Sequence, residues 1–599
     1  MAIIAALAVG GYAGFKEFKK RMGADLALNA RVANITDKID AIKERTSSTI
    51  ESVKERAKKL GKGIPAVFAL KGDEELPGIT LYLKHGGVMS GKLVSKTDGE
   101  YVIEWKGERY VVDANQVKDV ILKTQKEAEW AYKNDVAVKR TNGIVADGKI
   151  IDANENGARL LFDEGGGALE MGIDRKDIDY LMFAPVYNKE GEEIEKRLRE
   201  LFPKMKIYRE GNVVLFTDSH EKTAESYRKT LRAVYTDIYL KFFKAFKNKK
   251  PLQQNFVVVF DDFGGFANYA ISDLVPFWAV LGYFSPTGRT LYLYNGWGAK
   301  TEKLYYDWIM KTSDMYDETA GRIKDKYKDT SADIVIDGMA KELKDKYWDW
   351  YNMHKQEYTD ETFSVLRHEF SHEVFHNWGL QDVILSKSNI DKKKMTEKQK
   401  EIMDAIEKKD YDKLEELFKE VTRLKTAEHE DLALDAAQSW LGEGVATYCG
   451  TDPLGATDEE WLFLYQDAQR RGELNPIEFL MNFKMGSFPG LVPKAQIESY
   501  AESWAFTNFL MVKYPDRFME YQLQLSERRL KKGAGEKAKT EDDLALLLKS
   551  LNKDLPALEK EFKEYMAAYP QAEDPFVKKF MRYEKIKDAY MDVFRRHGG

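Results

Sequence analysis

The sequence predicts a multidomain protein in which an N-terminal helix precedes two small β-barrels and an α+β domain with a helical C-terminal part. Three observations support this prediction. The 599 residues exceed the size of one ordinary domain. Residues 79–121 and 136–181 repeat one another and show the short alternating strands of small β modules. From about 187 buried strands alternate with helical patterns, and from 459 helical patterns dominate.

The first segment, 1–23, contains an uncharged apolar run from Ala2 to Phe15, which lysines and an arginine follow. The run is shorter than the roughly 18 residues expected of a spanning helix, and no positive region precedes it as in a signal peptide. Three interpretations stay open for residues 2–15: a membrane anchor, a hydrophobic helix that is buried or bound to a partner, and a cleaved signal. The interpretation as a membrane anchor favours a membrane-anchored or bacterial cell-envelope location, with the cytoplasm as the alternative.

Residues 24–62 have the pattern of one long helix. Apolar side chains recur at alternating spacings of four and three, as in a heptad seam with charged flanks: Leu28, Val32, Ile35, Ile39 and Ile42. The segment 24–60 is therefore either a stalk or coiled coil that makes an oligomer, or a helix that packs on its own domain.

The two repeats define domains at 76–124 and 134–186. Gly86 and Gly91 of the first copy align with Gly143 and Gly148 of the second, and both copies end in a short apolar strand. In pattern each copy resembles a small SH3-like or Sm-like barrel. Spacer or packing modules are the simplest interpretation, and peptide binding is the alternative.

The composition excludes some classes of protein. Apolar residues make up 43% of the chain, which is enough to form several hydrophobic cores. The net charge of -6 argues against a general nucleic-acid binder, and the repeats lack the stacked aromatic side chains of a single-strand surface. The only cysteine, Cys449, rules out a disulfide within the chain and a cysteine-type zinc site.

The third domain is expected at 187–570, with a helical tail at 571–599. Charged, helical insertions are expected near 298–358 and 388–430. Buried strands are expected at 212–218, 255–262 and 289–295. A helix is expected at 224–246, between the first two of these strands.

A candidate metal site lies in "RHEFSHEVFH", residues 367–376. His368 and His372 are four positions apart, so on a helix both rings lie on one face, one turn apart, within reach of one metal ion. Glu369 lies about 100° further round the helix, where it can take a proton from metal-bound water. Thr359 or Asp360 is expected to cap this helix.

His376 is not expected to be a ligand. It lies eight residues after His368, about 12 Å along a straight helix. The third ligand must therefore come from elsewhere, and the best candidate is Glu443 in "SWLGEGVATY", 439–448. A carboxylate on a second helix would complete a site of two histidines and one glutamate, with a fourth position left for water. The flanking glycines suggest a close approach to the helix of His368.

These stretches resemble the gluzincin zinc peptidases, whose second helix carries W-L-x-E-G-x-A, and more widely the peptidase-MA-like domains of bacterial proteins. The resemblance covers roughly 205–570 and includes "HEFSH", "WLGEGVATY" and a later "YAESWAFTNFL" at 500–510. It implies a thermolysin-like metallopeptidase domain with one Zn²⁺ ion and a peptide or protein substrate. It also implies an oxyanion donor, for which Tyr500 is the first candidate and Tyr448 the second.

Two departures from the family qualify this resemblance. About seventy residues separate His372 from Glu443, more than in compact gluzincins, and the insertion at 388–430 accounts for most of them. The G-x-M-E-N signature of aminopeptidases is missing, which favours an endopeptidase. The strand at 289–295 could align an extended peptide by strand addition.

The expected reaction is hydrolysis of a peptide bond by a water that the metal and Glu369 activate. A non-catalytic scaffold is the rival from a different class, in which the barrels and the N-terminal helix bind partners and the zinc domain is structural or retired. A metal-dependent hydrolase of a non-peptide bond would use the same ligands.

Overall fold

The computed structural model describes residues 78–578, except for 84–87, 97–99, 106–107, 124–133, 164–167, 274, 276–279, 286–287, 327–331, 382–396, several positions between 399 and 419, 422–438, 483–493, 534–542 and 576. The segments 1–23 and 24–62 therefore lie outside the described residues, as does the tail beyond 578. The described residues form two compact units, which divide between Asp135 and Val136. In the part of the chain that the structure describes, no helix has both the length and the apolar character needed to cross a membrane.

The smaller unit holds the first repeat, as one antiparallel sheet in the order β4-β3-β2-β1-β5. Leu81, Tyr101, Ile103 and Val112 form its core. The strands are β1 (Gly78–Leu83), β2 (Val88–Lys96), β3 (Glu100–Trp105), β4 (Glu108–Asp113) and β5 (Val117–Lys123). Among the described strands β4 and β5 remain the two edges, so this sheet is open and the predicted closed barrel is not formed.

The second repeat has the same strand order but is divided into two sheets of three strands, β10-β9-β8 and β11-β6-β7. Its strands are β6 (Val136–Arg140), β7 (Val145–Ala146), β8 (Lys149–Asn154), β9 (Gly157–Asp163), β10 (Ala168–Asp174) and β11 (Ile178–Phe183). Where β2 of the first copy runs unbroken through Gly91, the second copy is interrupted at Asp147 and Gly148. A Cβ at Gly148 would lie 2.9 Å from the Phe162 ring, so the break is packed too closely for a side chain. The second copy is therefore not a closed barrel either.

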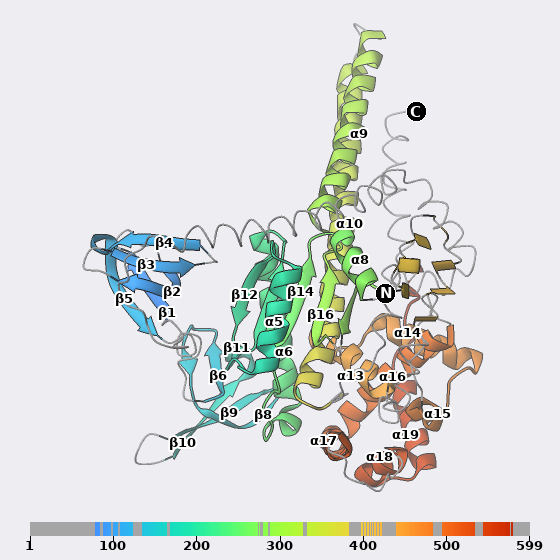
Figure 1. The fold of residues 1–599 in the computed structure, drawn as a ribbon. Helices are drawn as coiled ribbons and strands as arrows, with labels where there is room; N and C mark the ends of the chain where they lie inside the picture. Colours follow the sequence, from blue (N-terminus) through green and yellow to red (C-terminus); the bar gives the residue numbers. More distant parts are fainter. Residues whose placement is uncertain are drawn as a thin grey trace. The chain divides into compact units, whose positions relative to one another are not determined.

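The larger unit contains the second repeat and a mixed sheet in the order β12-β13-β14-β16-β15 (Figure 1). The central strands β13, β14 and β16 are parallel, and the outer strands β12 and β15 are antiparallel to their neighbours. The bounds are β12 (Lys206–Glu210), β13 (Val213–Thr217), β14 (Asn255–Phe260), β15 (Gly282–Ser285) and β16 (Thr290–Tyr294). The predicted strands at 212–218, 255–262 and 289–295 are thus confirmed within one or two residues.

Side chains alternate along β14 between two cores. Phe256, Val258 and Phe260 face the core covered by α5 (Lys189–Leu201) and α8 (Phe263–Ser272). Val257 and Val259 face the other core, which α6 (Glu221–Lys241) and α10 (Ala332–Asn377) cover. Because a strand turns successive side chains to opposite faces, a strand that is apolar throughout requires such covering on both sides.

The second core extends into the second repeat, which therefore belongs to the same packed body as the mixed sheet. Val138, Leu160 and Leu181 of that repeat are buried in the cluster that contains α6 and α10. The Arg175 guanidinium also pairs with Asp237 of α6 at 2.6 Å.

Two long helices, α9 (Ala299–Lys326) and α10, lie side by side and extend from the mixed sheet as a hairpin (Figure 1). Nearly all the described residues of the charged segment 298–358 are helical, as predicted. The segment is not separate from the motif helix, however, because α10 runs without a break from Ala332 to Asn377. The predicted cap is therefore wrong: Thr359 Oγ1 donates to the carbonyl of Lys355 and Asp360 accepts from Gln356, both within the helix.

The C-terminal part is helical, as predicted. It comprises α13 (Ser439–Cys449), α14 (Glu459–Arg471), α15 (Ile477–Asn482), α16 (Lys494–Lys513), α17 (Pro515–Gly533), α18 (Asp543–Leu551) and α19 (Leu555–Ala567). Helix α13 packs between α10 and α16, which brings its side chains to the face of α10 that carries the histidines. The described residues thus form a multidomain α+β protein with small antiparallel sheets and a helical C-terminal part.

Candidate metal centre

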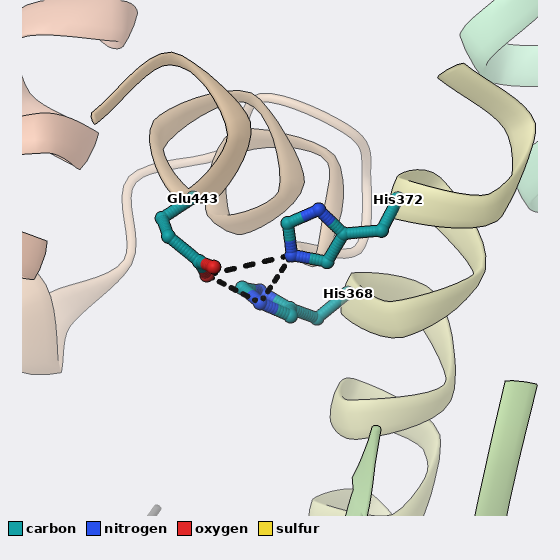
Figure 2. A group of neighbouring side chains, drawn as sticks. All are labelled: His368, His372 and Glu443. Carbon is teal, nitrogen blue, oxygen red and sulfur yellow. Dashed lines mark hydrogen bonds and ion pairs between the residues drawn. The ribbon is translucent and has the colours of Figure 1, made fainter. Parts of the chain in front are cut away.

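His368 and His372 lie one turn apart on α10, and their Nε2 atoms are 3.3 Å from each other. Glu443, on α13, points at both rings (Figure 2). Its Oε2 atom lies 3.3 Å from Nε2 of His368 and 3.4 Å from Nε2 of His372. The structure therefore brings together the three residues that the sequence predicts as ligands, from positions as much as 75 apart in the chain.

The spacing of these three atoms fits a tetrahedral metal ion. Ligand atoms about 2.0–2.1 Å from a tetrahedral centre are separated from one another by about 3.3–3.4 Å. All three separations in the cluster have this value. The side chains of His368, His372 and Glu443 are 17%, 16% and 20% exposed, so the cluster is largely but not completely buried. Two imidazoles and one carboxylate could thus hold a divalent ion and leave a position open to solvent.

The charges within the cluster support the same interpretation. Burial alone would raise the pKa of Glu443, but the two histidines outweigh it and hold that pKa well below its ordinary range. Burial alone would lower the pKa of His372, but the carboxylates of Glu443 and Glu369 raise it to about 9. Without a metal, one cationic ring therefore neutralises the Glu443 carboxylate. A metal ion must displace that proton, so acid is expected to weaken metal binding.

Glu369 lies beside the cluster, as predicted for a general base. Its Oε2 atom accepts a hydrogen bond of 2.9 Å from the backbone N–H of Phe284 in β15. Burial raises the pKa of Glu369, an effect that His368 and His372 partly oppose. A carboxylate that is held in one orientation and has a raised pKa is suited to accept a proton from water and later release it.

The strand nearest the site is β15 and not β16. The predicted peptide-aligning strand at 289–295 contains β16, which lies between β14 and β15 and has neither edge free. Among the described strands β15 pairs only with β16, so its outer edge is the one available to an extended chain. The N–H of Phe284 on that edge points at Glu369.

His376 is not part of the cluster, as the helical spacing predicts. It is buried near the end of α10, and its ring packs against the ring of Phe284 with the centroids 5.3 Å apart. It therefore contacts the strand that reaches Glu369.

The two candidate tyrosines are in different places. Tyr500, on α16, stacks on Trp461 and lies within hydrogen-bonding reach of Glu443. Burial, followed by the carboxylates of Glu443 and Glu369, raises its pKa well above the ordinary value, so its hydroxyl stays protonated and can donate. Tyr448 points elsewhere: its hydroxyl meets the backbone at Gly455, and burial raises its pKa without any influence of the cluster. The structure brings Tyr500 to the site and leaves Tyr448 outside it.

The two glycines beside Glu443 differ in how closely other side chains and backbone approach them. A Cβ at Gly442 would meet only Cε1 of His372, at the ordinary distance of 3.9 Å. A Cβ at Gly444 would lie 2.6 Å from the carbonyl oxygen of Ser503 and closer still to the Thr507 hydroxyl. The close approach that the glycines indicate is therefore real, but it joins α13 to α16 and not to the helix of His368.

Gly444→Ala is expected to lower the free energy of unfolding by about 1–3 kcal/mol, because the new methyl group forces α13 and α16 apart. Gly442→Ala, two positions away on the same helix, is the matched control. It is expected to be neutral or stabilising, because alanine has the higher helix propensity and no clash arises. Urea unfolding of the metal-free variants gives the measurement, and equal midpoints for the two would contradict this account of Gly444.

Sequence reasoning missed the residues that hold α10 in place. The side chain of Glu373 is fully buried and accepts a hydrogen bond from the N–H of Phe256 in β14, and burial raises its pKa well above the ordinary value. Asn377 donates to Asn255 at 2.8 Å. These bonds attach the C-terminal end of α10 to the start of the central strand β14. The signal was the second glutamate of "HEFSHE", which shares a helix face with Asn377 four positions later.

No family model, no curated protein and no solved structure matches this chain. Any function assigned to the chain therefore depends on the geometry of its site.

Proposed function

We propose that this protein is a zinc-dependent hydrolase of peptide bonds, of the gluzincin type with a thermolysin-like domain at 187–570. The observation that carries the proposal is the convergence of His368, His372 and Glu443 at tetrahedral spacing, with Glu369 beside them. Two imidazoles, one carboxylate and an adjacent second carboxylate are the donor set and general base of that chemistry.

A bound Zn²⁺ ion would supply a Lewis acid that lowers the pKa of water and polarises the carbonyl of the substrate. Glu369 accepts the proton of the attacking water and delivers it to the leaving amine. The N–H of Phe284 keeps the Glu369 carboxylate turned towards the site. The Tyr500 hydroxyl donates to the oxyanion as it forms, and burial keeps that hydroxyl protonated.

The substrate that suits this arrangement is an extended polypeptide. An extended chain can add to the outer edge of β15 through backbone hydrogen bonds, and the N–H of Phe284 places that edge next to Glu369. The sequence lacks the G-x-M-E-N signature of aminopeptidases, which favours cleavage within a chain. We also propose a membrane-anchored or cell-envelope location, because the sequence of residues 2–15 is apolar.

A non-catalytic scaffold is the second candidate function, favoured by the surface of the α9–α10 hairpin. Trp308 and Trp348 on this hairpin are 45% and 36% exposed, and Leu304 is exposed as well. Exposed large apolar side chains are typical of contact surfaces. In this alternative the metal would hold α10 and α13 together without turnover.

Metal removal tests the proposed function. The purified protein is expected to contain one zinc ion per chain and to cleave an unfolded protein substrate. Treatment with a chelator should abolish cleavage, and added zinc should restore it, as followed by gel electrophoresis and mass spectrometry of the products. Stoichiometric zinc without cleavage of a broad set of peptides would support the scaffold, and absence of bound zinc would overturn the proposal.

A further inference from the structure

Arg289 lies directly before β16, in a backbone conformation that residues with a side chain seldom adopt. Its φ is 46°, in the left-handed region. Such a conformation persists only where the surroundings hold it in place. Arg289 also adjoins the candidate substrate strand, because Ser285, the last residue of β15, lies opposite Thr290 in the antiparallel pair. Contacts that fix Arg289 therefore also restrain the end of β15.

Two acceptors hold the side chain of Arg289. Its Nη1 atom donates to Oε2 of Glu190 on α5 at 2.8 Å and to Oε1 of Gln253 at 3.1 Å. The Glu190 side chain is 54% exposed, so this ion pair alone is a weak restraint. Gln253 is completely buried, and a buried amide oxygen that loses its donor costs free energy. The bond to Gln253 is therefore the stronger of the two restraints.

Gln253 connects Arg289 to the C-terminal end of α10. Its Nε2 atom donates to Oδ1 of Asn377, the last residue of α10, at 3.1 Å. Because a guanidinium can only donate, the amide oxygen of Gln253 must face Arg289 and the amide nitrogen must face Asn377. The amide of Asn377 is oriented in the same way, since it donates to Asn255 at 2.8 Å. The hydrogen bonds thus form one directed series from β16 to α10.

Strand β15 itself contacts α10 in the same region. The N–H of Phe284 donates to Glu369 at 2.9 Å, and the Phe284 ring packs against the ring of His376. A Cβ at Gly282 would lie 3.2 Å from Cγ1 of Val365, so strand and helix approach closely there as well. A shift of the β15–β16 pair would therefore move the outer edge of β15 relative to Glu369.

We infer that Arg289 is a positioning residue for substrate binding, whose guanidinium acts through Gln253 and Asn377 to hold β15 where an extended chain can pair with it beside Glu369. The inference rests on the proposed function and adds to it a residue outside the metal ligands and the general base. Backbone bonds to an edge strand are made in the bound substrate and in the transition state alike. A displaced strand is therefore expected to raise KM more than it lowers kcat.

Arg289→Met removes both hydrogen bonds and keeps an apolar stem and the same backbone conformation. It is expected to raise KM by about tenfold and to leave kcat within about threefold, with an unchanged Kd for zinc. Arg289→Lys is the conservative variant: one nitrogen of Arg289 makes both bonds, so an ammonium with three protons can replace it, and KM should stay within about threefold. Arg199→Met is the control, since Arg199 pairs with Glu195 on the exposed side of α5.

The measurement uses the full-length, zinc-loaded variants and a fluorogenic peptide built on the first cleavage site mapped in the unfolded protein substrate. Steady-state kinetics separates KM from kcat. Hydrogen exchange followed by mass spectrometry reports on β15, and melting temperatures report on the whole fold. A raised KM and faster exchange in β15 for Arg289→Met, with rescue by Arg289→Lys and neither effect in Arg199→Met, would support the inference.

Equal KM values in Arg289→Met and the unchanged protein would overturn the inference, as would a loss confined to kcat or equal exchange in β15. If Arg289→Met does not fold, Arg289→Gly takes its place, because glycine removes the side chain and relieves the positive φ. An unchanged KM in that variant would then overturn the inference. Failure of the proposed function is distinct: the unchanged protein would cleave no peptide, and exchange in β15 would still decide whether Arg289 holds the strand.

Discussion

Glu369→Gln is expected to bind zinc as the unchanged protein does and to lose peptide hydrolysis by about 10²–10⁴-fold. An amide can still accept the hydrogen bond from the N–H of Phe284, so the side chain should keep its place. It cannot take a proton from water, because a neutral amide is not a base at any pH that the protein tolerates. The loss is therefore expected in kcat, with little change in the amount of bound metal.

The measurement is metal content and cleavage rate on the same preparation. Glu361→Gln is the matched control, since it makes the same exchange on α10 about 12 Å before Glu369. It should keep both zinc and activity. Equal activity in Glu369→Gln and the unchanged protein would exclude Glu369 as the base. Loss of zinc in Glu369→Gln would show that its charge serves the metal and not the reaction.

Tyr500→Phe is expected to lower kcat by about 10²–10³-fold and to leave KM nearly unchanged. The hydroxyl of Tyr500 lies beside Glu443, and burial keeps it protonated, so it can donate where negative charge develops. A donor that acts on the oxyanion contributes to the transition state and little to the ground state, which is why the effect should appear in kcat.

Tyr448→Phe is the matched control for this prediction. Tyr448 lies on the same helix as Glu443, but its hydroxyl meets the backbone at Gly455, away from the cluster. Its activity should stay within a few-fold of the unchanged protein. Steady-state kinetics on one cleavable peptide separates kcat from KM for both variants. A loss that appears in Tyr448→Phe and not in Tyr500→Phe would reverse the assignment that the structure supports.

Local spacing explains why the sequence was informative about the three clustered residues. His368 and His372 fall on one face of any helix that contains them, whatever the rest of the fold does. Glu443 required a second motif, "WLGEG", and the docking of α13 on α10 brings it to within 3.4 Å of both rings. The buried strands were also predictable, because a five-residue apolar run such as 256–260 can be buried on both faces only in a covered sheet.

Features that depend on distant packing could not be predicted in this way. Thr359 and Asp360 have the side chains of a helix cap, but nothing in their local sequence shows that the helix starts at Ala332. Strand β15 has only four residues, too few for a period to be visible. The contact of Gly444 with Ser503 and the interruption of the second repeat at Gly148 each depend on a neighbour elsewhere in the chain.

The arrangement of ligands on α10 and α13 has a consequence for how the protein folds. The two histidines become neighbours as soon as a few turns of α10 form, whereas Glu443 arrives only when a loop of about seventy residues has closed. The entropy lost in closing such a loop grows with the logarithm of its length, so this step comes late. A metal ion held weakly by the helical pair would then gain its third bond at the moment α13 docks, and its affinity would report how far assembly has proceeded.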